Sequence, residues 1–433
     1  MFYPECRRSD RETVCGVDAN ELLTRRWNVR GHATRSAIAV SSVALAVLGI
    51  AGCSKQSSSS DNSAQSSDLK IVEQVQIDQN GAEVKPEAGA VPADPAGDGK
   101  ATCPPVSIAM AGALNGPDAA LGINIKNGVQ LAIDKHNAAN PGCQVQLKPF
   151  DTEGDPQKAT AIAPQIVDDA FTIGLVGPAF SGETKATGAV FDQAGLVSAT
   201  ASATNVTLSE QGWKTFFRGL ANDGVQGPSV ANYLKNTLGD KKVCVVDDST
   251  DYGTGLAQAV RETLGSVAVS DCNISVKKGD KDFSAAVTQV KGQSPDSVFY
   301  SGYYAEAAPF VQQLRDGGFT GKFVSADGTK DPEFVKQAGG SSKDAILSCP
   351  CGPATGAFAD EYTKKFGQAP GTYSTEGYDL GTILLKGIDA GKITRPDLLD
   401  WVKNYDGQGV ARKYQWTDKG ELTTTLIWIY KVQ

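Results

Sequence analysis

Histidine is nearly absent from this chain, which contains two histidines among 433 residues. Ser-His-Asp catalytic sets, HExxH zinc helices and histidine-rich metal sites therefore have almost no candidates. His32 lies in a segment that we expect to be removed, which leaves His136. This residue ends the run 128–137, whose apolar spacing predicts a helix, and a histidine is favourable at a helix C-terminus. We interpret His136 as structural, and we expect no catalytic site, no metal site and no cofactor.

The sequence also lacks long apolar runs beyond one near the N-terminus, and it lacks an excess of positive charge. No later segment approaches the length of about 20 uncharged residues that a membrane-spanning helix needs. Lys and Arg number 41 against 49 Asp and Glu, a net charge of −8. Such a balance gives no general attraction to nucleic acid or anionic lipid. Heptads and solenoid periods are missing too, so we expect a globular protein that does not bind nucleic acid.

The one uncharged run, Ser36 to Cys53, follows an arginine-rich segment. A basic segment, an apolar run and then small residues are typical of an export signal. Here the small residues end in Cys53 and a serine-rich stretch follows, which resembles the lipobox of bacterial lipoproteins. A transmembrane anchor is the alternative, but the run is short for a bilayer. We expect residues 1–52 to be a lipoprotein signal peptide, Cys53 to carry lipid, and the exported chain to be anchored on the outer face of the cell membrane.

The first 24 residues suit the start of an export signal badly. They contain five acidic residues, whereas such a start is normally basic. A later start, such as one near Val29, would remove the conflict.

Residues 53–102 are rich in Ser, Ala, Gly, Pro and Asp and hold few large apolar side chains. Such a segment cannot bury enough surface to offset the entropy that is lost on ordering. We therefore expect a flexible, lipidated tether, with folded sequence from Cys103 onward.

Six cysteines follow Cys53, and in an oxidising compartment they suggest three disulfides. Several connectivities are possible, but the predicted strands narrow them. Cys103 and Cys143 each precede a strand of one set, and Cys244 and Cys272 lie in or beside successive strands of another. Adjacent parallel strands can bring Cα atoms within bridging distance. We expect the pairs Cys103–Cys143 and Cys244–Cys272, with Cys349–Cys351 as a close pair. A Cys-x-Cys can also belong to a metal site, but no second cluster accompanies it.

Predicted strands and helices alternate from Cys103 onward. The first set has strands at 106–111, 143–150, 171–177 and 196–200, with helices between them. A second set begins after 222–224, with strands at 242–247, 267–276, 297–300 and 322–325. The chain is mostly helical beyond Pro353 and closes with a strand at 423–432. This alternation predicts an α/β protein in which two parallel sheets, covered by helices, form two lobes.

Polar and aromatic residues follow several of these strands, at the end where parallel sheets bind ligands. Ser181 opens a helix in a Gly-flanked loop, where a hydroxyl and backbone N–H groups can hold an anion. Tyr252, Tyr303 and Asp327 follow strands of the second set. A carboxylate facing these hydroxyl and N–H donors suits a zwitterion, whose ammonium and carboxylate would each meet an opposite partner. Aromatic rings would cover the side chain of the zwitterion. Other interpretations stay open: Ser181 as a helix cap, Tyr303 as core, and Asp327 as part of a turn.

The ordered series of short motifs resembles the branched-chain amino-acid binding proteins, which are type I periplasmic binding proteins of ABC importers. The series runs from about Val106 to the C-terminus. Its members are Asn127-Gly128, Ala132-Ile133, Asp151, Asp155-Pro156, Ala203-Thr204-Asn205, Gln226-Gly227-Pro228, Asp251-Tyr252-Gly253, Gly255-Leu256-Ala257, Lys281-Asp282-Phe283-Ser284 and Gly302-Tyr303-Tyr304. The resemblance implies two doubly wound lobes joined by a three-crossing hinge near 221–224, 349–352 and 417–420. Lobe 1 would comprise 103–222 and 353–417, and lobe 2 would comprise 223–352 and 418–433.

The resemblance also implies how the two charged ends of an amino acid would be held. By position, Ser181 and Thr204 would bind the carboxylate, assisted by the Tyr252 hydroxyl. The ammonium would meet the Ser202 carbonyl, the Thr204 hydroxyl and Asp327. The family usually has Glu where this chain has Asp327, which is one methylene shorter.

The pocket for the ligand's side chain follows from the same resemblance. Phe180, Tyr303 and Gly328 would line it, and Ala203 lies within the same binding set. Leu121 stands where the family often has an aromatic residue, which leaves the preferred apolar amino acid open.

The function that the resemblance implies is capture of an amino acid, Leu, Ile or Val, between two closing lobes. The monomeric binding protein would deliver it to an ABC permease driven by an ATPase, without catalysis. Three alternatives stay open: a ligand-sensing receptor domain of the same fold, a binder of amides, urea or aromatic acids, and an exported hydrolase. The hydrolase would use Ser181 or Thr204, but a nucleophile needs a positioned base, and His136 is far along the chain.

Overall fold

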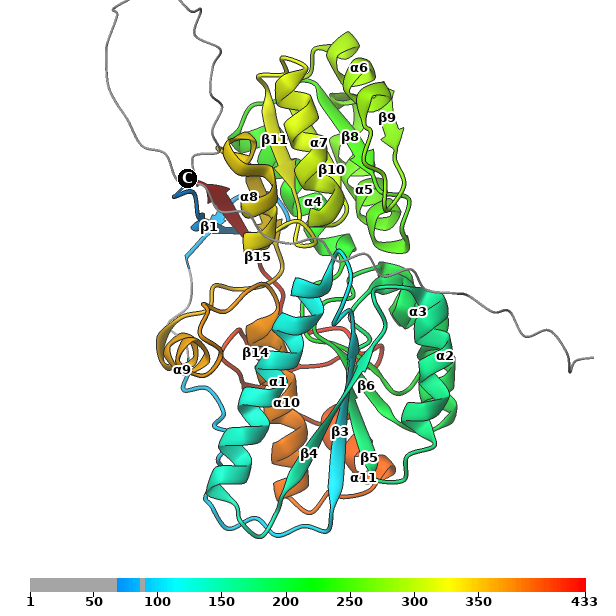
Figure 1. Ribbon diagram of the computed structural model, residues 1–433, viewed down its shortest axis with the longest axis vertical. Helices are drawn as coiled ribbons and strands as arrows, with labels where there is room; N and C mark the ends of the chain where they lie inside the picture. The colour runs from blue at the N-terminus through cyan, green and yellow to red at the C-terminus, as the bar shows by residue number, and fades with distance from the viewer. Residues whose placement is uncertain (1–67, 86–89) are drawn as a thin grey trace, which may run out of the picture. The chain divides into compact units, whose positions relative to one another are not determined.

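The computed structural model describes residues 68–85 and 90–433 (Figure 1). The expected signal peptide and Cys53 lie outside the described residues. No helix within the described part is long and apolar enough to cross a membrane.

The first lobe is built on a five-stranded sheet whose neighbouring strands all run parallel, in the order β4-β3-β5-β6-β7. Its strands are β3 (Val106–Gly112), β4 (Val145–Asp151), β5 (Thr172–Val176), β6 (Val197–Thr200) and β7 (Phe216–Arg218). Helices α2 (Pro156–Val167) and α3 (Ser181–Gln193) cover one face, and α1 (Ala119–Ala139) and α10 (Ser374–Asp389) cover the other (Figure 1). Ala109 and Ala111 of β3 pack in the α2–α3 core, whereas Ile108 and Met110 pack in the core that includes α1 and α10. Strand β3 is therefore buried on both faces, which explains its continuous apolar run.

Helices from the C-terminal part of the chain complete this lobe. α9 (Gly356–Phe366) and α10 pack on α1, and α11 (Arg395–Lys403) packs on α10 and β5. A short hairpin follows, made of β13 (Asp406–Gln408) and β14 (Lys413–Gln415).

The second lobe contains an eight-stranded sheet in the order β2-β1-β15-β12-β11-β10-β8-β9. Strands β8 to β12 run parallel: β8 (Val243–Asp247), β9 (Ala268–Ser275), β10 (Ser297–Ser301), β11 (Lys322–Ser325) and β12 (Ile346–Cys349). β15 (Ile427–Val432) joins them antiparallel. The helices of this lobe are α4 (Asp223–Asn232), α5 (Asp251–Leu264), α6 (Ser284–Gln293), α7 (Tyr304–Asp316) and α8 (Pro332–Ala338). The predicted α/β fold with two parallel-sheet lobes is thus confirmed.

The expectation of a flexible tether over 53–102 is wrong for part of that segment. β1 (Ile71–Ile77) pairs antiparallel with β15, and β2 (Glu83–Val84) pairs with β1. Residues 93–101 run along the first lobe, where the Ala93 N–H donates to the Gln408 carbonyl at 2.7 Å. The polar composition of the whole segment concealed one short stretch, Ile-Val-Glu-Gln-Val-Gln-Ile, whose last residue, Ile77, is buried against the second sheet.

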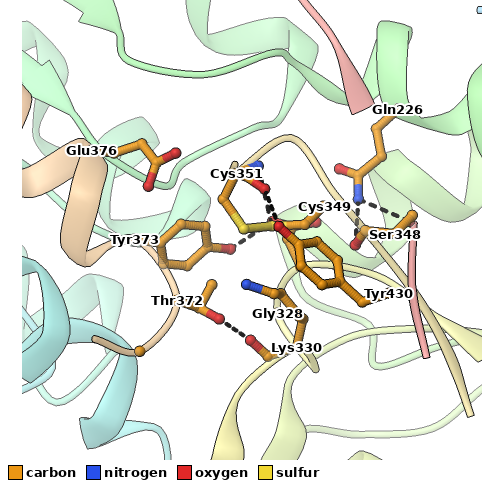
Figure 2. Close-up of a disulfide and its surroundings, with 12 residues drawn as sticks. Gln226, Gly328, Lys330, Ser348, Cys349, Cys351, Thr372, Tyr373, Glu376 and Tyr430 are labelled. Atoms are coloured by element: carbon orange, nitrogen blue, oxygen red, sulfur yellow. Dashed lines mark hydrogen bonds between the residues drawn. A yellow bond between two sulfur atoms is a disulfide. The ribbon is translucent and has the colours of Figure 1, made fainter. Parts of the chain in front are cut away.

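The chain passes between the two sheets after β7, after β12 and after β14, near the three places expected for a hinge. The three expected cysteine pairs are all present as disulfide bonds. Cys349–Cys351 lies at the second passage, and Figure 2 shows Tyr430 directed toward it. The Tyr430 hydroxyl donates to the Cys351 carbonyl at 3.0 Å. Because Tyr430 belongs to β15 of the second lobe, this bond ties the second passage to that sheet.

His136 lies in the last turn of α1 and is fully buried, as its structural interpretation requires. Its Nε2 lies 2.8 Å from Asp389 Oδ1, and its Nδ1 lies 3.0 Å from Asn137 Oδ1. Burial opposes the charged imidazole, but the bonds to Asp389 and Asn137 outweigh burial and raise the pKa of His136.

Candidate functional site

A cavity lies between the two lobes. The first lobe contributes Leu121, Ala179, Phe180, Ser181, Ser202 and Tyr373, and the second contributes Tyr252, Tyr303 and Asp327. Most of these residues directly follow a parallel strand or begin the next helix, which is where α/β sheets bind ligands. All nine are buried, so both lobes close around the cavity.

Seven of the ten residues expected to contact a ligand line this cavity: Leu121, Phe180, Ser181, Ser202, Tyr252, Tyr303 and Asp327. The other three, Ala203, Thr204 and Gly328, are buried immediately beside it. At Gly328 a Cβ would lie 2.8 Å from the Gly302 carbonyl oxygen and 2.9 Å from Tyr252 Cε1. Any larger residue would clash with these atoms, so only glycine fits there. Because glycine has no side chain, Tyr252 and Tyr303 can pack against the loop that contains Gly328.

The wall from the first lobe offers hydrogen-bond donors. α3 begins at Ser181, after Phe180 in an extended conformation, so the N–H groups of the first helical turn face this end of the lobe. The Ser181 Oγ accepts from the Asn205 N–H at 3.3 Å, which leaves the hydroxyl proton of Ser181 free to donate. The buried Thr204 Oγ has no hydrogen-bond partner among the described residues. This wall can therefore hold an anion such as a carboxylate.

The wall from the second lobe is centred on Asp327, of which 1% is exposed. Its Oδ1 accepts from the Tyr252 hydroxyl at 2.8 Å, and its Oδ2 accepts from the Tyr373 hydroxyl at 2.6 Å. Burial raises the pKa of Asp327, although both tyrosine bonds oppose this. The Tyr252 hydroxyl donates to Asp327 and accepts from the Gly328 N–H, so its proton is directed at Asp327. The resemblance implied instead that this hydroxyl would help to bind the ligand's carboxylate.

Tyr373 lines the cavity and Asp223 lies near Asp327 without lining it; the sequence predicted neither position. Tyr373 precedes α10 with a φ of 69°, and the local sequence pattern does not predict this backbone conformation. Asp223 starts α4, is fully buried, and lies beside Thr204. Burial and the negative charge of Asp327 raise the pKa of Asp223 to about 8. Because two neighbouring buried carboxylates repel each other when both are ionised, they favour a bound cation.

Aromatic rings form the apolar part of the cavity. The ring centroids of Phe180 and Tyr303 are 5.0 Å apart, and those of Tyr252 and Tyr303 are 5.2 Å apart. Phe180 belongs to the first lobe and Tyr303 to the second, so this cluster spans both lobes. With Leu121 it can cover an aliphatic side chain.

The position of His136 argues against the alternative function of a hydrolase. His136 lies fifteen residues beyond Leu121 on α1, about 20 Å along the helix axis. It is also held by Asp389, so it cannot act as a base for Ser181 or Thr204. Among the described residues, no group of three or more His, Cys, Asp or Glu side chains could hold a metal ion.

Comparison with known proteins gives consistent matches. The family model "periplasmic binding protein" matches residues 105–433. An amino acid binding protein of Pseudomonas aeruginosa is 31% identical over 337 residues, covering 75% of this chain and 90% of that protein. The leucine-, isoleucine-, valine-, threonine- and alanine-binding protein of the same species is 28% identical, covering 66% and 78%. Among solved structures, the branched-chain amino acid transporter substrate binding protein LivJ of Streptococcus pneumoniae, in complex with isoleucine, has a TM-score of 0.70 and 28% identity, covering 75% and 95%.

Proposed function

Because this chain belongs to the periplasmic binding protein family, we propose that it is an exported protein that captures leucine, isoleucine or valine between its two lobes. The closed protein delivers the amino acid to the membrane permease of an ABC importer. Binding energy drives closure of the lobes rather than bond making, so the protein needs no catalytic residues.

One observation carries the proposal: the buried cavity has an acid in one wall and anion-binding donors in the other. In this proposal Ser181 and Thr204 bind the ligand's carboxylate, and Asp327 with the Ser202 carbonyl binds its ammonium. Tyr252 and Tyr373 orient Asp327 through their hydroxyls. The arrangement matches a zwitterion whose two charges lie on one carbon.

The remaining cavity suits a small aliphatic side chain. Phe180, Tyr303 and Leu121 supply apolar surface that can cover such a side chain. An uncharged amide or urea would leave Asp327 without a cation, and an aromatic acid would bring a second negative charge without an ammonium. The acid wall therefore favours an amino acid over these alternatives.

A thermal-shift screen of the purified protein against the twenty amino acids, short amides, urea and benzoate tests this proposal. A ligand that binds only the folded state raises the melting midpoint by mass action. Leucine, isoleucine or valine should give the largest shifts. No shift with any amino acid would contradict the proposed function.

The affinity for leucine is expected to fall as the pH drops from about 8 to about 6. An ammonium favours the ionised acids, but Asp223 binds a proton below its pKa of about 8, and the pKa of Asp327 is raised too. Binding must then release that proton, which weakens the affinity by up to about tenfold per pH unit per proton. Calorimetric titrations in buffers of different ionisation heat would measure the released protons. A pH-independent affinity with no proton release would contradict this linkage, and Asp223→Asn should flatten the dependence.

We also propose that the protein is held at the outer face of the membrane by lipid on Cys53. The support comes from the sequence: an apolar run that ends in small residues and this cysteine. Cys53→Ser should move the protein from the membrane fraction to the soluble extracytoplasmic fraction, and retention in the membrane would contradict lipid anchoring there.

A further inference from the structure

Lys278, in the loop after β9 of the second lobe, reaches the first lobe at the rim of the cavity. Its Nζ lies 2.9 Å from Asp118 Oδ2 and 3.5 Å from the Gly154 carbonyl oxygen, both in the first lobe. Of the two side chains in this ion pair, Asp118 is 1% exposed and Lys278 is 29% exposed. The pair is therefore largely withdrawn from water and weakly screened by salt.

The same ammonium lies against two rings that line the cavity. It is 5.1 Å from the ring centroid of Phe180 and 4.8 Å from that of Tyr303, within the range of cation–π attraction. Phe180 comes from the first lobe and Tyr303 from the second. Lys278 thus contacts both lobes at the aromatic wall without lining the cavity itself.

Asp118 holds a position where an acid normally caps a helix, but it does not do so here. It is the N-cap residue of α1, yet its side chain makes no capping hydrogen bond. The carboxylate pairs instead with a lysine of the other lobe. Its interaction is therefore available only when the lobes are together.

Lys278 keeps its charge in this setting. Burial favours the neutral amine, but Asp118 outweighs burial, and the pKa of Lys278 is raised. Two buried acids of its own lobe, Glu306 and Asp248, also attract the ammonium. When the lobes separate, Lys278 keeps these acids and loses Asp118, the Gly154 carbonyl and the Phe180 ring, so Asp118 is the charged partner that depends on closure.

We propose that Lys278 and Asp118 form a latch that holds the lobes closed over the amino acid and sets how slowly the amino acid leaves. Lys278 acts as a positioning residue: it secures Phe180 and Tyr303 against each other and does not touch the ligand. The effect on amino-acid release rests on the proposed function, whereas closure of the lobes by the latch does not.

The test compares Lys278→Met with a matched control, Lys185→Met. Lys185 also pairs across the lobes, with Asp251 at 2.6 Å, but these side chains are 54% and 35% exposed. Exposed pairs contribute little, so the control should bind L-leucine like the wild type. Lys278→Met leaves Asp118 buried without a cation, and leucine affinity should fall by about ten- to a hundredfold, mostly through faster dissociation.

A double variant separates the latch from simple damage to the fold. Asp118→Asn removes the unpaired charge that Lys278→Met leaves behind, so the double variant should bind leucine more tightly than Lys278→Met alone. The order of preference among leucine, isoleucine and valine should stay unchanged in every variant. A leucine affinity of Lys278→Met within threefold of the wild type would overturn the latch.

Small-angle scattering of the ligand-free protein distinguishes failure of the latch from failure of the proposed function. If no amino acid binds the wild type, the proposed function fails, and the latch is judged by the radius of gyration. A larger radius for Lys278→Met than for the wild type and Lys185→Met supports the latch, and equal radii overturn it.

Discussion

Asp327→Ala is expected to weaken L-leucine binding by about a hundredfold or more, because it leaves a buried ammonium without its carboxylate. The folded protein should lose little stability. In the ligand-free site Asp327 is buried and its pKa is raised, so ionising it already costs free energy that the variant avoids. Titration calorimetry gives the affinity, and urea unfolding gives the stability. The expected signature is lost binding in a protein that still folds.

Two further variants sharpen this test. Asp327→Asn keeps the shape and removes the charge, so it should also lose most of the binding. Asp240 is a comparably buried acid near the start of β8, at the opposite end of the same sheet, where it pairs with Lys322 at 2.6 Å. Asp240→Asn should lower the free energy of unfolding and leave the affinity unchanged. Leucine binding by Asp327→Ala within threefold of the wild type would rule out Asp327 as the ammonium site.

Removal of the Cys244–Cys272 disulfide in a double alanine variant is expected to lower the free energy of unfolding by about 3–4 kcal/mol. The two cysteines are 28 residues apart and join neighbouring strands β8 and β9. A crosslink of this span restricts the unfolded chain, so its removal gives the unfolded state more conformations.

The matched control is Cys349–Cys351, whose cysteines are two residues apart. This disulfide closes a very short loop and therefore restricts the unfolded chain little. Its removal should lower the free energy of unfolding by only about 1 kcal/mol. Urea unfolding under non-reducing conditions measures both variants. Equal losses for the two pairs would show that restriction of the unfolded chain is not how these bonds stabilise the protein.

The fold was accessible from sequence because buried parallel strands give short continuous apolar runs, and turn residues separate them from helices. The positions after those runs supplied Ser181, Ser202, Tyr252, Tyr303 and Asp327, which the structure brings to one cavity. Strand ends at one edge of a sheet converge whatever the loop details are.

The missed features depend on partners far along the chain. β1 forms only because β15, more than 300 residues later, offers an open edge, and its own segment has the composition of a linker. Tyr373 reaches Asp327 because the chain returns to the first lobe after β12. Asp223 resembled a turn residue at a domain boundary, and its proximity to Asp327, about 100 residues later in the chain, exists only once the second lobe is folded.

Calorimetric titration of the purified protein with L-leucine, L-isoleucine and L-valine tests whether the cavity binds a branched-chain amino acid. We expect saturable binding of at least one of the three, with one amino acid per chain and proton release below about pH 8. No heat and no binding for all three, in a protein whose folding is verified by its unfolding transition, would contradict the assignment of this cavity to a branched-chain amino acid.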